Sequence, residues 1–310
     1  MNCDVNNHIH TTYSFSPYTP AAAVQKAVES GLAAAGIVDH DTVAGAPEFI
    51  AEGKRLGLPV TVGFELRVSH AHTDIGRRRT NHPDQNDISY LTVHAVPDAK
   101  LDAVTAFLAP VRKARGERNR EMCKRLGLNY DAEVLPLSMH HKGGTVTERH
   151  ILFAKAQQDY AELARLKAAF TEYIPAGREE CPGIDAVLRF ADEHSLIAAY
   201  PYLGDVTKSV TGDKKPQMFE DAYLDELIHI LYELGVRAVT YMPSRNTRAQ
   251  LLRLRALCEK YGMLQICGED INSPDQPFVC EALRDPLFDN LRESTWALIK
   301  REGRQGKHTQ

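Results

Sequence analysis

Two histidines near the start of the chain, His8 and His10, have the residue type and the spacing of metal ligands. They end a short apolar run, and side chains at i and i+2 of a strand point to the same face. If residues 3–9 form a strand, both imidazoles leave it in one direction and can bind one ion. The pair alone is weak evidence, because a surface or hydrogen-bonded histidine is more common than a ligand.

Other short apolar runs also end in side chains that can bind metals or phosphate. These ends carry Asp39, His40, Asp41, Glu65, His94, Tyr200, Arg245 and Asp270. In a (β/α) barrel, functional side chains gather at the C-terminal ends of the strands. The whole set therefore predicts a metal site, although no single residue does.

The chain reads as strand-then-helix units, interrupted once by a long helical stretch. Strands are expected at residues 3–9, 33–38, 59–65, 88–96, 196–202, 236–242 and 264–268. Helices are expected at residues 21–30, 45–56, 184–194, 219–234, 247–261 and 281–301. Residues 66–87 are expected to form a polar loop. Seven strands that alternate with helices predict a parallel sheet, most simply a distorted seven-stranded (β/α) TIM-like barrel.

The long helical stretch, with candidate helices near 98–126 and 147–171, predicts an insertion in this barrel. We expect residues 1–97 and 181–303 to form the barrel and residues 98–180 to form a helical insertion over the active-site face. Residues 304–310 would be a polar tail. An insertion that roofs the site would favour small substrates over long polymers.

Composition argues against several classes of protein. Of 310 residues, 43% are apolar and 25% are charged, as in ordinary soluble proteins. The net charge of −4 gives no electrostatic reason to expect nucleic-acid binding. There is no apolar stretch of about 18 residues and no secretory signal, and the six cysteines lack a CxxC spacing. We therefore expect a cytoplasmic protein with reduced cysteines and no membrane contact.

Taken in order, the motifs resemble those of the polymerase and histidinol phosphatase (PHP) family of metal-dependent phosphoesterases. The family's His-x-His-Thr-x-Tyr-Ser-Asp-Gly is similar to residues 8–16, and its Thr-Asp-His-Asp-Thr-Val-x-Gly is similar to residues 38–45. Its Gly-x-Glu resembles residues 63–65, and a strand histidine follows at His94. The later matches are Arg149-His150 and, for Gly-Ser-Asp-x-His, residues 268–272.

The resemblance implies two or three metals in a distorted seven-stranded barrel. At the matching positions, the first metal would take His8, His10, Glu65 and Asp270 as ligands. The second metal would share Glu65 and add His94 and His150. Imidazole and carboxylate ligands suit zinc, manganese or iron. His140 and His141 are close to His150 in sequence, but we expect them to lie in a solvated loop.

Three positions depart from the family pattern. Phe15 and Asn272 replace two ligands of the third metal, which leaves only His40, and Tyr200 replaces the histidine of an Ala-His-Pro motif. Phenylalanine cannot bind a metal, and an amide oxygen is a poor ligand for these ions. We therefore predict a dinuclear site.

A dinuclear site indicates hydrolysis. Two metals about 3.5–4 Å apart can activate a bridging hydroxide and stabilise the attacking and leaving oxygens. The prediction is a metal-dependent phosphoesterase that hydrolyses a small phosphorylated molecule, a phosphomonoester or nucleotide, with a metal-bridging hydroxide. His40 would act as general acid on the leaving group or would orient a ligand through a hydrogen bond, and both roles stay open.

Arginine is the usual bidentate partner of phosphate. Arg245, directly after an expected strand, is our first choice, and Arg78 in the basic run 77–79 could fold over the substrate. Either side chain could instead be a solvated surface arginine. Tyr200 and Asn272 are expected to line the substrate site.

Two other functions remain open. The first is a PHP-fold binding or regulatory module without turnover, which Phe15, Tyr200 and Asn272 favour. The second is a dinuclear hydrolase of amides or lactones. The arginines favour phosphate as the substrate group, and six competent ligand positions favour an enzyme. The sequence does not indicate an oligomeric state.

Overall fold

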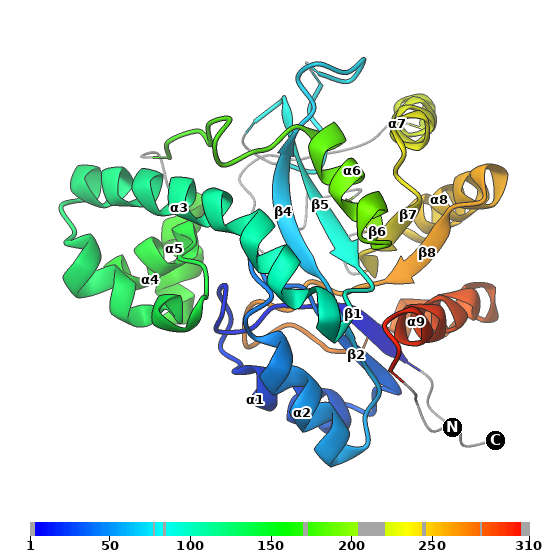
Figure 1. The fold of residues 1–310 in the computed structure, drawn as a ribbon, viewed down its shortest axis with the longest axis horizontal. Coiled ribbons are helices and arrows are strands. Elements are labelled where there is room, and N and C mark those ends of the chain that lie inside the picture. The colour runs from blue at the N-terminus through cyan, green and yellow to red at the C-terminus, as the bar shows by residue number, and fades with distance from the viewer. Residues whose placement is uncertain are drawn as a thin grey trace.

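The computed structural model describes residues 4–76, 78–82, 85–169, 173–203, 221–243, 246–279 and 281–304. In this part of the chain two sheets are surrounded by helices (Figure 1). The first sheet has three parallel strands in the order β1 (Val5–Ile9), β2 (Ala34–Ile37) and β3 (Val60–Val62). The second sheet has five strands in the order β4 (Phe64–Ser69), β5 (Ile88–His94), β6 (Ile197–Tyr202), β7 (Ala238–Tyr241) and β8 (Leu264–Cys267).

The prediction of a closed seven-stranded parallel barrel is not confirmed. The described residues form eight strands in two sheets, and β4 and β5 are antiparallel, as are β5 and β6. The described residues between β4 and β5 form no helix, and β5 pairs antiparallel to β4 instead of following it as a parallel crossover unit. Isolated bridges from Ile9 to Ile271 and from His40 to Glu65 connect the edges of the two sheets.

The division between the sheets falls at Gly63, in the middle of the strand expected at residues 59–65. A Cβ atom at Gly63 would lie 2.5 Å from the carbonyl oxygen of Val93. Only glycine allows this approach, and the chain passes here from β3 to β4. The strand β4 then continues to Ser69, so it includes the first residues of the expected loop.

The helices outside residues 98–180 follow the predicted pattern closely. They are α1 (Pro20–Glu29), α2 (Ala46–Leu56), α6 (Ile184–Glu193), α7 (Asp221–Leu234), α8 (Arg248–Tyr261) and α9 (Asn290–Arg301). Local signals set several of their ends. Thr19 caps α1 through the amide of Ala22, and Gly57 and Gly262 end α2 and α8 in the left-handed conformation. The helix expected at 281–301 begins only at Asn290, after two short 3₁₀ turns.

Residues 98–180, which we call the helical segment, lie together on the left of Figure 1. They include α3 (Leu101–Leu126), α4 (Glu148–Lys155) and α5 (Tyr160–Ala169). The single helix expected at 147–171 is broken between α4 and α5, where Gln157 and Gln158 have φ values of 52° and 66°. Two residues in the left-handed region cannot continue an α-helix.

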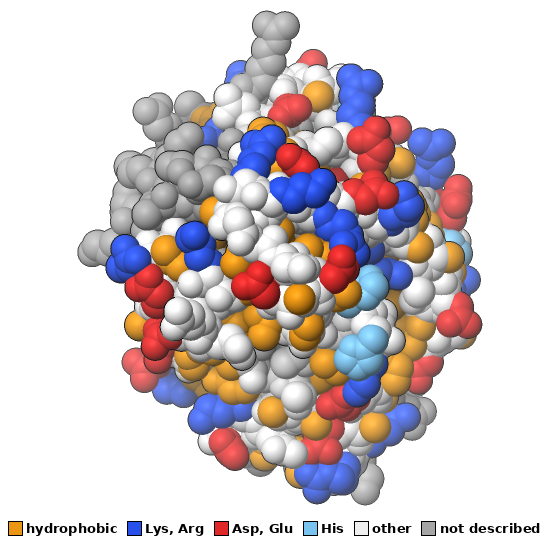
Figure 2. Space-filling view, turned by 90° about the vertical axis from the view of Figure 1, so that its left-hand side faces the viewer, with side chains coloured by type: hydrophobic (Ala, Val, Ile, Leu, Met, Phe, Trp, Pro, Cys, Tyr) orange, Lys and Arg blue, Asp and Glu red, His pale blue; other side chains and the backbone are white. Residues whose placement is uncertain are grey.

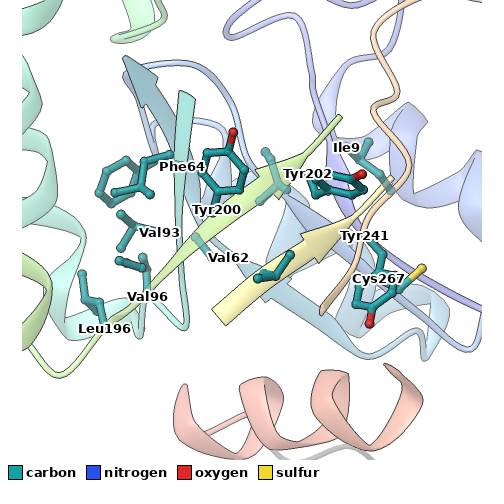
Figure 3. Packing of buried hydrophobic residues seen from close by; sticks show 14 of the residues in the cluster. Ile9, Val62, Phe64, Val93, Val96, Leu196, Tyr200, Tyr202, Tyr241 and Cys267 are labelled. Atoms are coloured by element: carbon teal, nitrogen blue, oxygen red, sulfur yellow. The ribbon is translucent and has the colours of Figure 1, made fainter. Parts of the chain in front are cut away.

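One large apolar core connects both sheets to the surrounding helices. Tyr200 and Tyr202 of β6 are fully buried in it, near Phe64 and Ile9 (Figure 3). Phe15 belongs to a separate apolar cluster with Leu152 of α4. Within the described residues, no helix is long and apolar enough to cross a membrane.

Candidate metal centre

Three predicted ligands come together where β1 and β4 lie close to each other. His8, His10 and Glu65 each offer a ligand atom, and these atoms all lie within 4.8 Å of one another. The Glu65 carboxylate faces both imidazoles: Oε1 lies 3.6 Å from His8 Nε2, and Oε2 lies 3.6 Å from His10 Nε2. All three side chains are buried, so their polar atoms need partners within the site.

Asp270 and His40 extend this group. The Oδ1 atom of Asp270 lies 3.3 Å from His10 Nε2, and Nδ1 of His40 lies 3.1 Å from Glu65 Oε2. The rings of His10 and His40 stack with their centroids 4.5 Å apart. The predicted first-metal ligands, His8, His10, Glu65 and Asp270, are thus neighbours, and His40 lies beside them.

The donor set fits a divalent metal. His8 is fully buried, and neither of its ring nitrogens has a hydrogen-bond partner among the described residues. A buried imidazole without partners is costly unless it binds something. Gly268 leaves room for the His8 side chain, because the Cβ atom of any other residue at position 268 would lie 2.6 Å from His8 Cβ and would clash with it. Imidazole and carboxylate donors suit zinc, manganese or iron better than calcium.

Asp39 holds the loop that follows His10, a role that the sequence did not indicate. Its Oδ1 accepts hydrogen bonds from the Thr11 amide and from Ser14 Oγ, both at 2.6 Å. Ser14 Oγ also lies 3.4 Å from His10 Nδ1. Burial alone would lower the pKa of His10, but the carboxylates of Asp270 and Glu65 raise it above its ordinary value. Such contacts behind a ligand orient its ring.

The two histidines that a second metal would add to Glu65, His94 and His150, are buried but do not join the ligand group found among the described residues. His94 ends β5, and its Nε2 lies 3.0 Å from Thr92 Oγ1, while Nδ1 has no partner in the described part of the chain. Burial, with the charge of nearby His8, lowers the pKa of His94 to about 3. His150 lies in the first turn of α4, where Nδ1 accepts from the Thr147 amide at 3.0 Å.

Phe15 lies against the predicted ligand His150, with ring centroids 5.0 Å apart in an edge-to-face arrangement. It also contacts Phe153 at 5.5 Å. The side chain that replaces the family's carboxylate therefore packs α4 against the first motif. His140 and His141, by contrast, are exposed, as the sequence suggested.

The side chains predicted to bind substrate lie in different places. Asn272 is buried, and its Nδ2 donates to Asp270 Oδ1 at 2.5 Å, so it contacts a candidate ligand. Tyr200 is fully buried in the apolar core. Arg78 is 40% exposed and forms an ion pair with Glu226 of α7. Arg245 lies outside the described residues.

Arg149 is an arginine near the centre to which sequence reasoning gave no role beyond its place in the Arg-His motif. It is partly buried, and no ion pair or hydrogen bond joins it to the other described residues. Burial lowers the pKa of His40 well below its ordinary value, and the charges of His10, Arg115 and Arg149 lower it further. Arg149 is therefore a cation close to His40 that has no carboxylate partner in the described structure.

A buried ion cluster connects the helical segment to the residue after His40. Arg115 of α3 donates to Asp41 Oδ2 at 2.6 Å and to Glu148 Oε2 at 2.7 Å. Arg67 of β4 binds Glu148 and Glu180 at 2.8 and 2.6 Å, and Arg118 of α3 binds the same two glutamates. Asp41 itself has a φ of 54°, and its amide donates to the Glu65 carbonyl at 2.8 Å. The cluster thus fixes Asp41, the residue that follows His40 and whose amide is bonded to the Glu65 main chain.

Comparison with known proteins places these motifs in a family. The family model described as PHP domain matches residues 6–236. The 3′,5′-nucleoside bisphosphate phosphatase of Chromobacterium violaceum is 25% identical over 178 residues, which are 56% of this chain and 56% of that protein. The match therefore spans little more than half the length of this curated relative.

Two solved structures have the same fold. One is a protein of Bifidobacterium adolescentis, provisionally named a metal-dependent phosphoesterase, with a TM-score of 0.73 and 22% identity over 97% of both chains. The other is an amidohydrolase of Chromobacterium violaceum with bound sulfate and no metal. It has a TM-score of 0.67 and 16% identity, and the match covers 93% of this chain and 97% of that one.

Proposed function

The chain belongs to the PHP domain family, and from this premise we propose that it is a metal-dependent phosphoesterase that hydrolyses a small phosphorylated molecule. One observation carries the proposal. The buried group of His8, His10 and Glu65, with Asp270 at 3.3 Å from His10, has the donors that a divalent metal requires.

We propose two divalent ions, of zinc, manganese or iron. The first would be held by His8, His10, Glu65 and Asp270. The second would share Glu65 and require His94 and His150 to turn toward it. When bound, the ions supply positive charge for the phosphoryl oxygens and an activated water as nucleophile.

The protein's own residues would bind and orient the substrate and deliver a proton. Arg149 is suited to hold the non-bridging phosphate oxygens, because its guanidinium is partly buried and lacks a carboxylate partner among the described residues. His40 would hold Glu65 through the contact at 3.1 Å, a role that fits the neutral imidazole that its lowered pKa implies. In the alternative role it would give a proton to the leaving oxygen, which requires the negative charge of a bound phosphate to raise its pKa first. Asn272 would fix the carboxylate of Asp270 through its amide.

The substrate class rests partly on similar proteins. The Chromobacterium violaceum relative is named for a small phosphorylated substrate, a nucleoside bisphosphate. This supports a phosphomonoester or nucleotide rather than a nucleic-acid polymer. Residues 98–180 would act as the insertion that limits substrate size, and we propose a cytoplasmic location. The amidohydrolase name of one structural neighbour keeps amide hydrolysis as a second candidate.

The direct test is to count metals by elemental analysis and assay phosphomonoesters, phosphodiesters, nucleotides, amides and lactones with added manganese. We expect about two metals per chain and hydrolysis of phosphomonoesters. Asp270→Ala is the control against a contaminating phosphatase. Less than one metal and no hydrolysis would instead favour a binding module, and activity restricted to amides or lactones would favour the second candidate.

A matched pair of arginine variants tests the substrate contact. Arg149→Gln is expected to raise KM or lower kcat by roughly tenfold or more, since hydrogen bonds to charged groups are among the strongest. Arg78→Gln removes an arginine that Glu226 already pairs, so it should change neither constant by more than about twofold. If Arg78→Gln changes KM or kcat and Arg149→Gln does not, Arg78 is the arginine that binds the substrate.

A further inference from the structure

A polar pocket lies on the helical segment, between α3 and the chain that leads into α4. Its volume is about 440 Å³. Its basic lining residues are Arg112, Lys113 and Arg120, the imidazole of His140 also lines it, and Glu117 carries the only carboxylate of the lining residues. Figure 2 looks toward this side of the molecule, where Lys, Arg and His side chains lie among acidic and apolar ones. The pocket thus has an excess of positive charge.

Arg112 is the basic side chain of the pocket that forms no ion pair with a described carboxylate, although the charge of Asp41 acts on it from nearby. Lys113 pairs with Glu117 at 2.5 Å, and Arg120 pairs with Asp131 at 2.6 Å. Arg112 donates from Nη1 to the carbonyl oxygen of Asp41 at 3.1 Å, and none of the described carboxylates forms an ion pair with it. Burial lowers its pKa, yet a guanidinium stays charged at any ordinary pH. Its Nε and Nη2 edge, the edge that binds oxyanions in a bidentate way, makes no hydrogen bond to the described residues.

A hydroxyl group in the same pocket is also unpaired. Thr145 lines the pocket and is 2% exposed, and its Oγ1 has no hydrogen-bond partner among the described residues. Buried hydroxyls in folded proteins usually have such a partner. A guanidinium edge without a partner, in a pocket lined by other basic side chains, is complementary to an oxyanion. The Thr145 hydroxyl is closed off from solvent in this structure, so it would join Arg112 as a donor by turning about its χ1 torsion toward the ligand.

We propose that this pocket binds a small molecule bearing a phosphate or a similar oxyanion, with Arg112 as its bidentate partner and Thr145 as a further donor. The pocket volume falls within the range of about 300–1,000 Å³ that small-molecule sites occupy. This inference goes beyond the proposed phosphoesterase activity and does not depend on it.

A ligand in this pocket would change the metal affinity of the centre through hydrogen bonds that join the pocket to the loops carrying the ligands. Thr42 Oγ1 donates to the Gly143 carbonyl at 2.7 Å, and the Thr145 amide donates to the Tyr13 carbonyl at 2.7 Å. With the bond from Arg112 to Asp41, three hydrogen bonds join the pocket to the loops that follow His10 and His40. By linkage, an anion that shifts these loops changes metal affinity, and bound metal changes anion affinity by the same factor.

The test is calorimetric titration of inorganic pyrophosphate into the metal-free full-length protein. Wild type should bind one pyrophosphate per chain in this pocket. Arg112→Gln should weaken binding by at least about tenfold, and Thr145→Val should weaken it by a smaller factor. Arg112→Lys should recover only part of the affinity, because lysine lacks the bidentate edge.

Two controls locate the binding site. Lys124→Gln removes a positive charge from α3 outside the pocket and should leave the affinity unchanged, since Lys124 pairs with Glu121. Arg149→Gln changes the metal centre, where pyrophosphate can also bind, so it should remove only a separate binding event there and leave the affinity of the pocket unchanged. The proposal is overturned if wild type does not bind millimolar pyrophosphate, or if Arg149→Gln abolishes binding while Arg112→Gln does not. A circular dichroism melt ensures that each variant is folded before it is titrated.

Discussion

Glu65 is the residue on which the contacts of the metal centre converge. Its two carboxylate oxygens lie 3.1–3.6 Å from nitrogens of His8, His10 and His40. One Glu65 oxygen faces His8 and the other faces His10 and His40. Such a carboxylate can bind one metal ion through each oxygen, whereas an imidazole binds only one ion through a given nitrogen. This geometry leaves two roles for His40, because its Nδ1 lies 3.1 Å from the Glu65 carboxylate while the charge of Arg149 acts on the same ring.

Substitution of His40 separates its two roles. We expect His40→Ala to lower kcat by about 10²–10⁴-fold, the usual contribution of a general acid, while the metal content stays unchanged. Elemental analysis and steady-state kinetics of the same preparation measure both quantities. If the variant loses an ion together with its activity, His40 is a ligand, and the proton must come from another group.

At the scale of elements, α3 lies outside both sheets and binds the residue that follows His40. Arg115 binds the Asp41 side chain, and Arg112 binds the Asp41 carbonyl. Breaking a buried ion pair by removing one partner commonly costs about 3–5 kcal/mol. Arg115 should therefore affect metal binding although it is not a ligand.

Two arginines of the ion cluster form a matched comparison. Both Arg115→Met and Arg118→Met remove a buried guanidinium that binds Glu148, but only Arg115 contacts Asp41. We expect both variants to lower the free energy of unfolding, and only Arg115→Met to weaken metal affinity, by roughly tenfold. Equal metal affinities in the two variants would show that α3 does not position the centre. Denaturant unfolding and metal titration measure the two effects.

The sequence could predict site residues that lie at the ends of strands, but it could not predict contacts that a helix makes with residues far away in the chain. His8, His10 and Glu65 could be found because each ends or begins a short apolar run, and Asp270 because it matched a motif. Arg115 and Asp41 are far apart in sequence, and nothing local marks an arginine of α3 as buried. Gly63 matched a motif, but nothing local predicted that the strand would break there, because its role depends on the carbonyl of Val93 across the sheet.

At the scale of the whole molecule, the metal centre lies where the two sheets meet. His8 comes from the first sheet and Glu65 from the second, and the bridges at Ile9 and His40 are the places where the sheet edges meet in the described structure. An ion bound by both residues would therefore connect the sheets at a place where the backbone ladder is interrupted. Its binding energy would add to global stability, because the unfolded chain does not hold these ligands together.

Removal of the metal should accordingly destabilise the entire fold. We expect chelated protein to unfold at a lower temperature than protein with added zinc or manganese, because an ion at about 100 times its Kd adds about 2.7 kcal/mol to the free energy of unfolding. His8→Ala, compared with and without metal, should lose most of this difference. His94→Ala should keep the contribution of the first ion and lose that of the second, which would establish two separate sites. If metal shifts the melting temperature of wild type and His8→Ala equally, the ion binds elsewhere, and the buried histidines at the junction of the sheets have a different function.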